Sequence, residues 1–197
     1  MVGNCGHGCG PFVGDIERFK GNIYGYQDLL KIDWGSLGDY LGLLDELRPA
    51  VNVATLVPNG NLRIAAVDDV ARPAMASETR DMARLLEAAL DASAFGLSTG
   101  LEYPPEHHAS EEEIIELCRI VAARGGLYAT HERERDLLAI ETVEEGIRAP
   151  MASGVRLQLS HLIPRRGAPD GALEAIIVFP ILLYLLLAEL ADHPRAP

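Results

Sequence analysis

The sequence predicts an α/β fold with a parallel sheet, either doubly wound or closed into a barrel. Short apolar runs alternate along the chain with segments whose apolar residues repeat at helical spacing. One helical segment separates each pair of apolar runs, which is the pattern of consecutive β-α-β units. We expect strands at 1–5, 51–57, 94–99, 127–131 and 155–161, and helices between them at 36–47, 77–90, 110–123 and 136–149.

The expected strands differ in how they end. The run VNVATLV at 51–57 is apolar and bounded by prolines, so we expect a strand buried on both faces of the sheet. The later runs AFGLST, LYATH and VRLQLSH finish on polar residues instead. Because parallel α/β folds hold their sites at the carboxyl ends of the strands, these polar ends are where chemistry is expected.

The helix expected at 110–123 carries the clearest local signals. Ser110 and Glu113 have the spacing of a capping box, and Arg124-Gly125-Gly126 ends the segment. Its apolar stripe includes Cys118, which is therefore assigned to the core. The preceding helix has a similar stripe, and Ser77 is the expected cap at its start.

Composition narrows the classes of partner and compartment. The chain has 17 Lys and Arg against 29 Asp and Glu, a net charge of −12, which argues against nucleic acid or an anionic membrane surface as a partner. Three cysteines without a disulfide-scaffold pattern favour a reducing compartment, and we expect the cytoplasm. The N-terminus lacks secretory-signal features, and the apolar run from Ala175, interrupted by Pro180, is shorter than the roughly 20 residues of a membrane span.

Three potential metal ligands fall at expected strand ends. Cys5 ends the first strand, His131 ends LYATH and His161 ends VRLQLSH. The two histidines are one β-α-β unit apart, so their imidazoles should stand on neighbouring strands. A thiolate and two imidazoles with an open position are a ligand set suited to catalytic zinc.

Other interpretations of these residues stay open at this stage. A histidine at a strand end can be a hydrogen-bonded structural residue, and Cys5 with Cys9 could form a C-x3-C zinc pair, although no second pair exists. His7 is expected to line the site only, and the adjacent His107 and His108 are expected in a solvated loop. The segment GNCGHGCG lacks the G-x-G-x-x-G pattern of nucleotide binding.

Five motifs carry a resemblance to a known family. They are VGNCG at 2–6, RPA at 72–74, FGLSTGLEYPP at 95–105, GGLYATHERER at 125–135 and GVRLQLSHL at 154–162. Together they resemble the N-acyl-D-amino-acid deacylase (D-aminoacylase) branch of the metal-dependent amidohydrolases. The resemblance implies a (β/α)8 barrel that hydrolyses the amide of a small-molecule N-acyl-D-amino acid. It also implies Cys5, His131 and His161 as zinc ligands, with Tyr103 and Arg133 as substrate contacts.

The same resemblance marks where the chain departs from the family. It covers about strands two to six of the barrel within residues 1–168, and residues 169–197 form a divergent apolar tail. The family's H-x-H pair and its catalytic aspartate have no counterpart here. A lysine that the family often carries after the SH pair is replaced by Ile163, which leaves Arg133, Arg165 and Arg166 as candidates for holding a substrate carboxylate.

The sequence therefore predicts part of a zinc-dependent hydrolase of linear amides. Because five strands cannot close a barrel of eight, we expect the 197-residue chain alone to be inactive and poorly stable. Two alternatives remain, a non-catalytic metal-binding or protein-interaction remnant of the scaffold and an incomplete gene product without its own function.

Overall fold

The computed structural model describes residues 1–23 and 31–178 of the chain. Its centre is a sheet of four parallel strands in the order β1-β2-β3-β4, formed by Val57–Pro58, Gly96–Gly100, Leu127–His131 and Arg156–Ser160. The strand order in space follows the order along the chain. The predicted α/β fold with a parallel sheet is confirmed.

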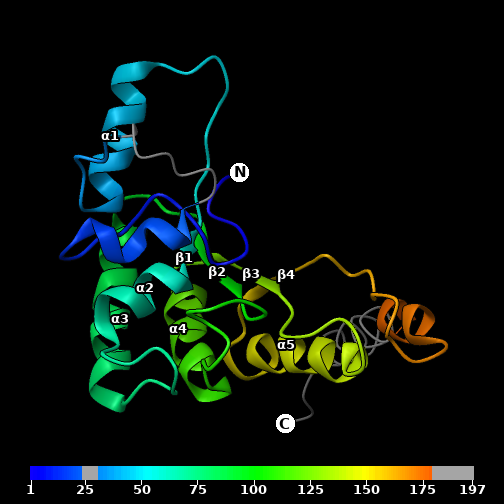
Figure 1. Ribbon diagram of the computed structural model, residues 1–197. Coiled ribbons are helices and arrows are strands. Elements are labelled where there is room, and N and C mark those ends of the chain that lie inside the picture. Colours follow the sequence, from blue (N-terminus) through cyan, green and yellow to red (C-terminus); the bar gives the residue numbers. More distant parts are fainter. Residues whose placement is uncertain (24–30, 179–197) are drawn as a thin grey trace, which may run out of the picture.

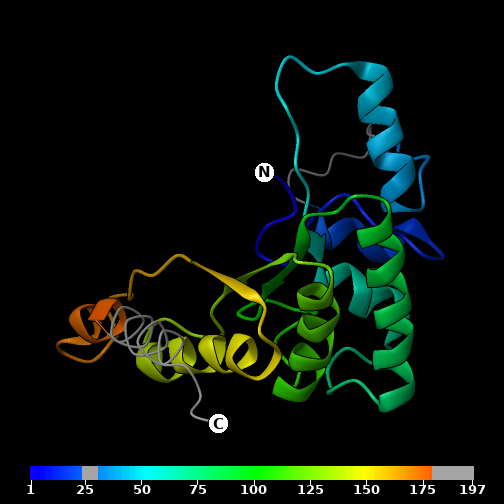
Figure 2. The same ribbon diagram turned by 180° about the vertical axis from the view of Figure 1, so that it is seen from behind.

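Helices connect the strands and cover the sheet (Figures 1 and 2). These helices are α2 (Asn59–Ala66), α3 (Ala76–Asp91), α4 (Glu111–Ala123) and α5 (Ala139–Ser153). The 3-10 helix η1 (Ile16–Asn22) and helix α1 (Leu37–Leu47) precede β1. Helices α2 to α5 pack against one another in sequence order. Helix α1 projects away from the sheet together with the segment that leads into β1 (Figure 1).

The main core lies between the sheet and helices α3 and α4. Leu97 of β2 and Tyr128 of β3 are buried there against Leu86 of α3 and Leu117 of α4. Cys118 is fully buried in the same core, as its place on the apolar stripe predicted. A smaller cluster joins Val143 and Ile147 of α5 to Ile176, beyond β4.

Two expected strands are much shorter than predicted. The first is present only as an isolated parallel bridge between Val2 and Thr55. The run at 51–57 contributes that bridge and the first residue of β1, whereas Val51 is 70% exposed. The prediction of a strand buried on both faces is therefore wrong for its first residues. In the part of the chain that the structure describes, residues 51–53 pair with no strand. Because they lack a partner, this part of the apolar run stays outside the sheet.

Local signals explain most of the differences at helix ends. Helix α1 has the full capping box, formed by Ser36 and Asp39. At α4, Ser110 accepts a hydrogen bond from the Glu113 backbone N–H, but the Glu113 carboxylate is turned inward to Arg63. Helix α3 starts one residue before the expected cap Ser77, because Glu78 accepts a hydrogen bond from the Met75 N–H.

The buried pair of Arg63 and Glu113 ties α2 to α4. Both side chains are almost completely excluded from water, and Arg63 Nη1 donates to the two carboxylate oxygens at 2.6 and 2.7 Å. The other guanidinium nitrogens donate to the backbone carbonyls of Pro105, Val70 and Arg72. Every nitrogen of this buried cation thus has a partner, which is the condition under which a buried charge is tolerated.

We expect Arg63→Ala to lower the free energy of unfolding by about 3–5 kcal/mol, because it leaves the Glu113 carboxylate buried without its partner. Arg148→Ala is the control, since its pair with Glu111 is half exposed and should contribute less than about 1 kcal/mol. Urea unfolding of the two variants measures the difference. Equal losses of unfolding free energy in the two variants would contradict a larger contribution from the buried pair.

Candidate metal centre

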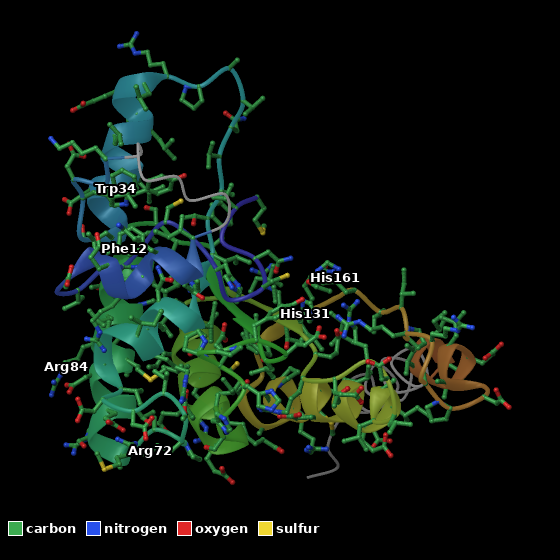
Figure 3. All side chains as sticks on the ribbon, in the orientation of Figure 1. Phe12, Trp34, Arg72, Arg84, His131 and His161 are labelled. Carbon is green, nitrogen blue, oxygen red and sulfur yellow. The ribbon has the colours of Figure 1, made fainter. Side chains whose placement is uncertain are left out.

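Cys5, His131 and His161 converge at the carboxyl edge of the sheet. One ligand atom from each residue lies within 4.8 Å of the others, and the Cys5 Sγ is 3.2 Å from His161 Nε2. The two imidazole centroids are 4.7 Å apart, and both rings stand beside each other in Figure 3. Within the described residues this is the one group of three or more Cys, His, Asp or Glu placed to share a metal ion.

Two of these residues have left-handed backbone conformations. Cys5 has φ 55° in a tight turn in which the His7 N–H donates to the Asn4 carbonyl, and the next residue, Gly6, has φ 69°. His161, directly after β4, has φ 59°. Such conformations cost free energy in residues other than glycine, and they concentrate at functional sites.

The turn that carries Cys5 is pressed against the end of β2. A Cβ at Gly100 would lie 2.1 Å from the Cys5 carbonyl oxygen, so only glycine permits this approach. The Gly6 N–H donates to Ser98 Oγ, and Asn22 Nδ2 donates to the Gly6 carbonyl. These contacts place the thiol beside the histidines.

His131 is held from one side by Glu102. Its Nε2 lies 2.8 Å from Glu102 Oε2, whereas its Nδ1 is buried and has no hydrogen-bond partner among the described residues. The ring of Tyr103 meets the imidazole edge-on with centroids 5.0 Å apart. Burial lowers the pKa of His131, although the contact with Glu102 opposes that shift, so the imidazole favours the neutral form that binds metals.

Glu102 is surrounded by cationic groups. Arg165 pairs with its Oε1, and Arg135 Nη2 lies 3.5 Å from its Oε2. Burial raises the pKa of Glu102, but the contacts with His131, Arg165 and Arg135 outweigh burial and leave the pKa below its ordinary value. The carboxylate is therefore held in its ionised form.

Two further glutamates near the centre, Glu106 and Glu132, are almost completely buried. Burial raises the pKa of Glu106 to about 7, although it accepts hydrogen bonds from Asn59 Nδ2 and the Gly100 N–H. Burial also raises the pKa of Glu132 to about 7, and neither of its oxygens has a partner among the described residues. Burial raises the pKa of the Cys5 thiol as well, with smaller contributions from both glutamates.

The structure separates the other residues considered from the sequence. Tyr103 lies at the centre between the rings of His131 and His7, and His7 Nδ1 contacts the Cys5 carbonyl at 2.6 Å. Arg133 lies elsewhere, because its guanidinium pairs with Glu145 of α5 and donates to the carbonyls of His107 and Ala109.

The remaining polar candidates are peripheral. His107 and His108 are exposed, as expected. The backbone carbonyl of Cys9 accepts from the Trp34 indole N–H, and its thiol is not in the group with Cys5.

Glu102 is the member of this centre that the sequence reasoning did not identify. A usable signal was present, because Glu102 follows the polar end of the 94–99 run and parallel sheets gather their functional groups at such ends. Cysteine and histidine are more distinctive metal ligands than glutamate, and they end other runs, at 1–5, 127–131 and 155–161. Arg165 was considered for substrate binding, but its pairing with Glu102 depends on a contact 63 positions apart that no local pattern contains.

The donor set fits a zinc ion. A thiol and two imidazoles are borderline-soft ligands that zinc prefers, and three protein ligands leave a position for substrate or water. The buried Nδ1 of His131, which lacks a partner among the described residues, is the kind of polar atom that a ligand normally satisfies.

Comparisons with known proteins identify the relatives of this chain. No family-level sequence model matches it. An N-acyl-D-glutamate deacylase and a D-aminoacylase from Alcaligenes xylosoxydans xylosoxydans are each 37% identical over 82% of the chain. The chain spans about a third of the length of these relatives, 32% and 33% respectively.

Solved structures give the same result. The crystal structure of a D-aminoacylase, described as defining a novel subset of amidohydrolases, covers 81% of this chain and 33% of its own with 38% identity and a TM-score of 0.71. N-acyl-D-glutamate deacylase from Bordetella bronchiseptica, complexed with zinc and a phosphonate inhibitor, covers 93% of this chain and 38% of its own with 28% identity and a TM-score of 0.79.

The fold and the comparisons together define an α/β chain that is similar to part of an amidohydrolase. More narrowly, over most of its length the chain is a homologue of the N-acyl-D-amino-acid deacylases, the D-aminoacylase branch, and corresponds to part of those proteins. Among the described residues, no helix is both long enough and apolar enough to cross a membrane.

We expect Glu106→Gln to change how stability depends on pH. A carboxyl whose pKa is raised to about 7 keeps its proton in the folded state, so its contribution to stability is lost as pH rises from about 4.5 to about 7. The variant should therefore gain stability relative to the wild type across that window, by about 3 kcal/mol at most.

Denaturant unfolding at a series of pH values measures this change. Glu46→Gln, at an exposed position on α1, is the control and should leave the pH profile parallel to that of the wild type. Parallel profiles for Glu106→Gln and the wild type would contradict the raised pKa.

Proposed function

We propose that this chain is the zinc-binding part of an N-acyl-D-amino-acid deacylase. The observation that carries the proposal is the convergence of Cys5, His131 and His161 within 4.8 Å at the carboxyl edge of the sheet. The likeness to deacylases over 82% of the chain supports the same reaction, hydrolysis of an N-acyl-D-amino acid to a carboxylate and a D-amino acid.

We further propose that the sheet is an arc of a (β/α)8 barrel, about strands two to six. The strand order never reverses, so there is no switch point of the kind that defines doubly wound sheets. Since β-α-β crossovers are right-handed, an unreversed order places the connecting helices on one face, which a barrel requires. In this proposal residues 1–168 form the barrel part and residues 169–197 form the divergent tail, most of which lies outside the described residues.

Cys5, His131 and His161 would hold the zinc ion. A zinc ion bound there supplies Lewis acidity, which polarises the amide carbonyl and lowers the pKa of water. His131 presents a buried, neutral imidazole, and the Cys5 thiol must lose its proton when a metal binds.

Three free thiols, Cys5, Cys9 and Cys118, support the cytoplasm as the compartment of the protein.

Tyr103 and Arg165 are the residues we assign to the substrate. Tyr103 borders His131 with its ring edge, so it can pack against an N-acyl group at the centre. Arg165 is connected to the centre, because it pairs with Glu102, which also contacts His131. The guanidinium of Arg133 is instead occupied by Glu145 and two backbone carbonyls. The half-exposed guanidinium of Arg165 retains donors that can bind a substrate carboxylate.

We infer that a complete active site needs residues beyond those described. Glu102 is a poor proton acceptor, because its pKa is held low by His131 and two arginines. In the part of the chain that the structure describes, β4 is also paired on one side only, as expected for an arc that further strands would close. The open edge also fits the alternative of a non-catalytic metal-binding or interaction remnant, which zinc binding without any binding of N-acyl-D-amino acids would support.

We expect the 197-residue chain to bind zinc and Cys5→Ala to weaken that binding strongly. Because the thiol is protonated at neutral pH, each unit of increasing pH should strengthen binding by about tenfold below the thiol pKa. This pH dependence should become shallower in Cys5→Ala. Competition with a chromophoric chelator measures both quantities.

Cys9→Ala is the matched control for the zinc experiment, and it should bind zinc like the wild type. Loss of binding in Cys9→Ala would favour a C-x3-C pair instead. Unchanged binding in Cys5→Ala would contradict the proposed site.

We expect the zinc-loaded chain to bind N-acetyl-D-glutamate more tightly than the corresponding α-amide. Arg165→Met should weaken binding of the acid by about 10–100-fold, as expected for the loss of a charged hydrogen bond, and should affect the amide less. Calorimetric titration measures the four affinities after the zinc content of each sample is checked. Arg84→Met, at an exposed position on α3, is the control and should bind both compounds like the wild type. Equal affinities for acid and amide would contradict carboxylate recognition.

A further inference from the structure

We propose that Glu102 is a positioning residue that fixes the tautomer and orientation of His131, so that the imidazole presents Nδ1 to the metal. The inference rests on the proposed zinc site and deepens it. It is carried by the 2.8 Å contact between Glu102 Oε2 and His131 Nε2 and by the buried Nδ1 that has no partner among the described residues.

The chemistry of the two groups decides which nitrogen carries the proton. An ionised carboxylate can only accept hydrogen bonds, so the contact at 2.8 Å requires the proton on His131 Nε2. In a neutral imidazole the other nitrogen, Nδ1, then holds the lone pair that binds a metal. A carboxylate that orients a metal-binding histidine in this way also raises the basicity of the ligand.

The backbone holds Glu102 in place beside His131. The N–H of Leu101 donates to the His131 carbonyl at 3.1 Å, which joins the residue before Glu102 to the end of β3. On the other side, the Tyr103 N–H donates to the Gly100 carbonyl at 3.0 Å. Both partners of the Glu102–His131 contact are therefore attached to strand ends, which favours a preorganised geometry.

The arginines divide the two oxygens of Glu102 between different partners. Oε1 pairs with Arg165, while Oε2 contacts His131 and lies 3.5 Å from Arg135. Arg165 also lies 3.7 Å from Asp136, so it bridges two carboxylates. With both oxygens engaged, Glu102 is arranged to orient the histidine and is poorly placed to be a metal ligand itself.

The first test examines the tautomer of His131 in the metal-free chain. Long-range 1H–15N NMR distinguishes the two neutral tautomers of an imidazole, and we expect the wild type to have the proton on Nε2. Glu102→Gln keeps a carbonyl oxygen that can accept this hydrogen bond and should preserve the tautomer. Glu102→Ala removes the acceptor and should give a mixture of tautomers.

The second test measures zinc affinity by chelator competition. Glu102→Ala should weaken zinc binding by about 10–100-fold, the usual cost of losing a partner of a metal ligand, and Glu102→Gln should weaken it less. Asp136→Asn is the matched control, because it removes a carboxylate from the same arginine without touching His131, and it should bind zinc like the wild type. Amide NMR spectra verify that each variant is folded.

The outcomes separate this inference from the proposed function. Wild-type tautomer and zinc affinity in a folded Glu102→Ala variant would overturn the role of Glu102 and leave the zinc site intact. Equal losses in Glu102→Ala and Asp136→Asn would also overturn it, in favour of a general effect of charge. Failure of the wild type to bind zinc would overturn the proposed site and, with it, the ligand-positioning role.

Discussion

The register of three parallel strands determines where every group of the candidate centre lies. Gly100 at the end of β2 is paired with His131 at the end of β3, and His131 is paired with Ser160 at the end of β4. His161 then follows β4 directly, and the Cys5 turn rests on Gly100. Because a shift of one residue moves each side chain to the opposite face of the sheet, the three ligand atoms can meet only in this register.

Two carboxylates, the buried Glu113 and the partly buried Glu102, have different partners and different effects in this fold. Glu113 faces a single guanidinium whose nitrogens all have partners, and the pair joins helices α2 and α4. Glu102 shares its oxygens among two arginines and a histidine at the edge of the sheet. The first arrangement joins two helices of the scaffold, whereas the second engages His131 Nε2 and leaves the buried Nδ1 without a partner among the described residues.

The sequence predicts the parallel sheet and the convergence of Cys5, His131 and His161, for physical reasons. Strands β2, β3 and β4 are short apolar runs with helices between them, and strand ends in such folds necessarily gather at one edge. The short β1 and the exposed Val51 could not be anticipated, because pairing depends on a neighbouring strand and not on the apolar run itself.

Contacts between distant segments set a second limit on prediction. The Glu113 side chain has the spacing of a capping box, yet it binds Arg63, which is 50 positions away. Similarly, Arg133 was expected to contact substrate, but its guanidinium pairs with Glu145 of α5. Local patterns describe the backbone cap at Ser110 correctly, but they cannot reveal which charged partner will compete for a side chain.

The left-handed backbone at Cys5 and His161 has a consequence for how such a site persists. Glycine would relieve the conformational cost at either position, so the backbone conformation alone favours replacing both residues. A chain kept only for its fold would gain from losing them, whereas a chain kept for its chemistry must bear the cost. In the proposed zinc site, cysteine and histidine at these two positions give up some stability in exchange for donor atoms, a trade-off common in proteins whose sites oppose their folding.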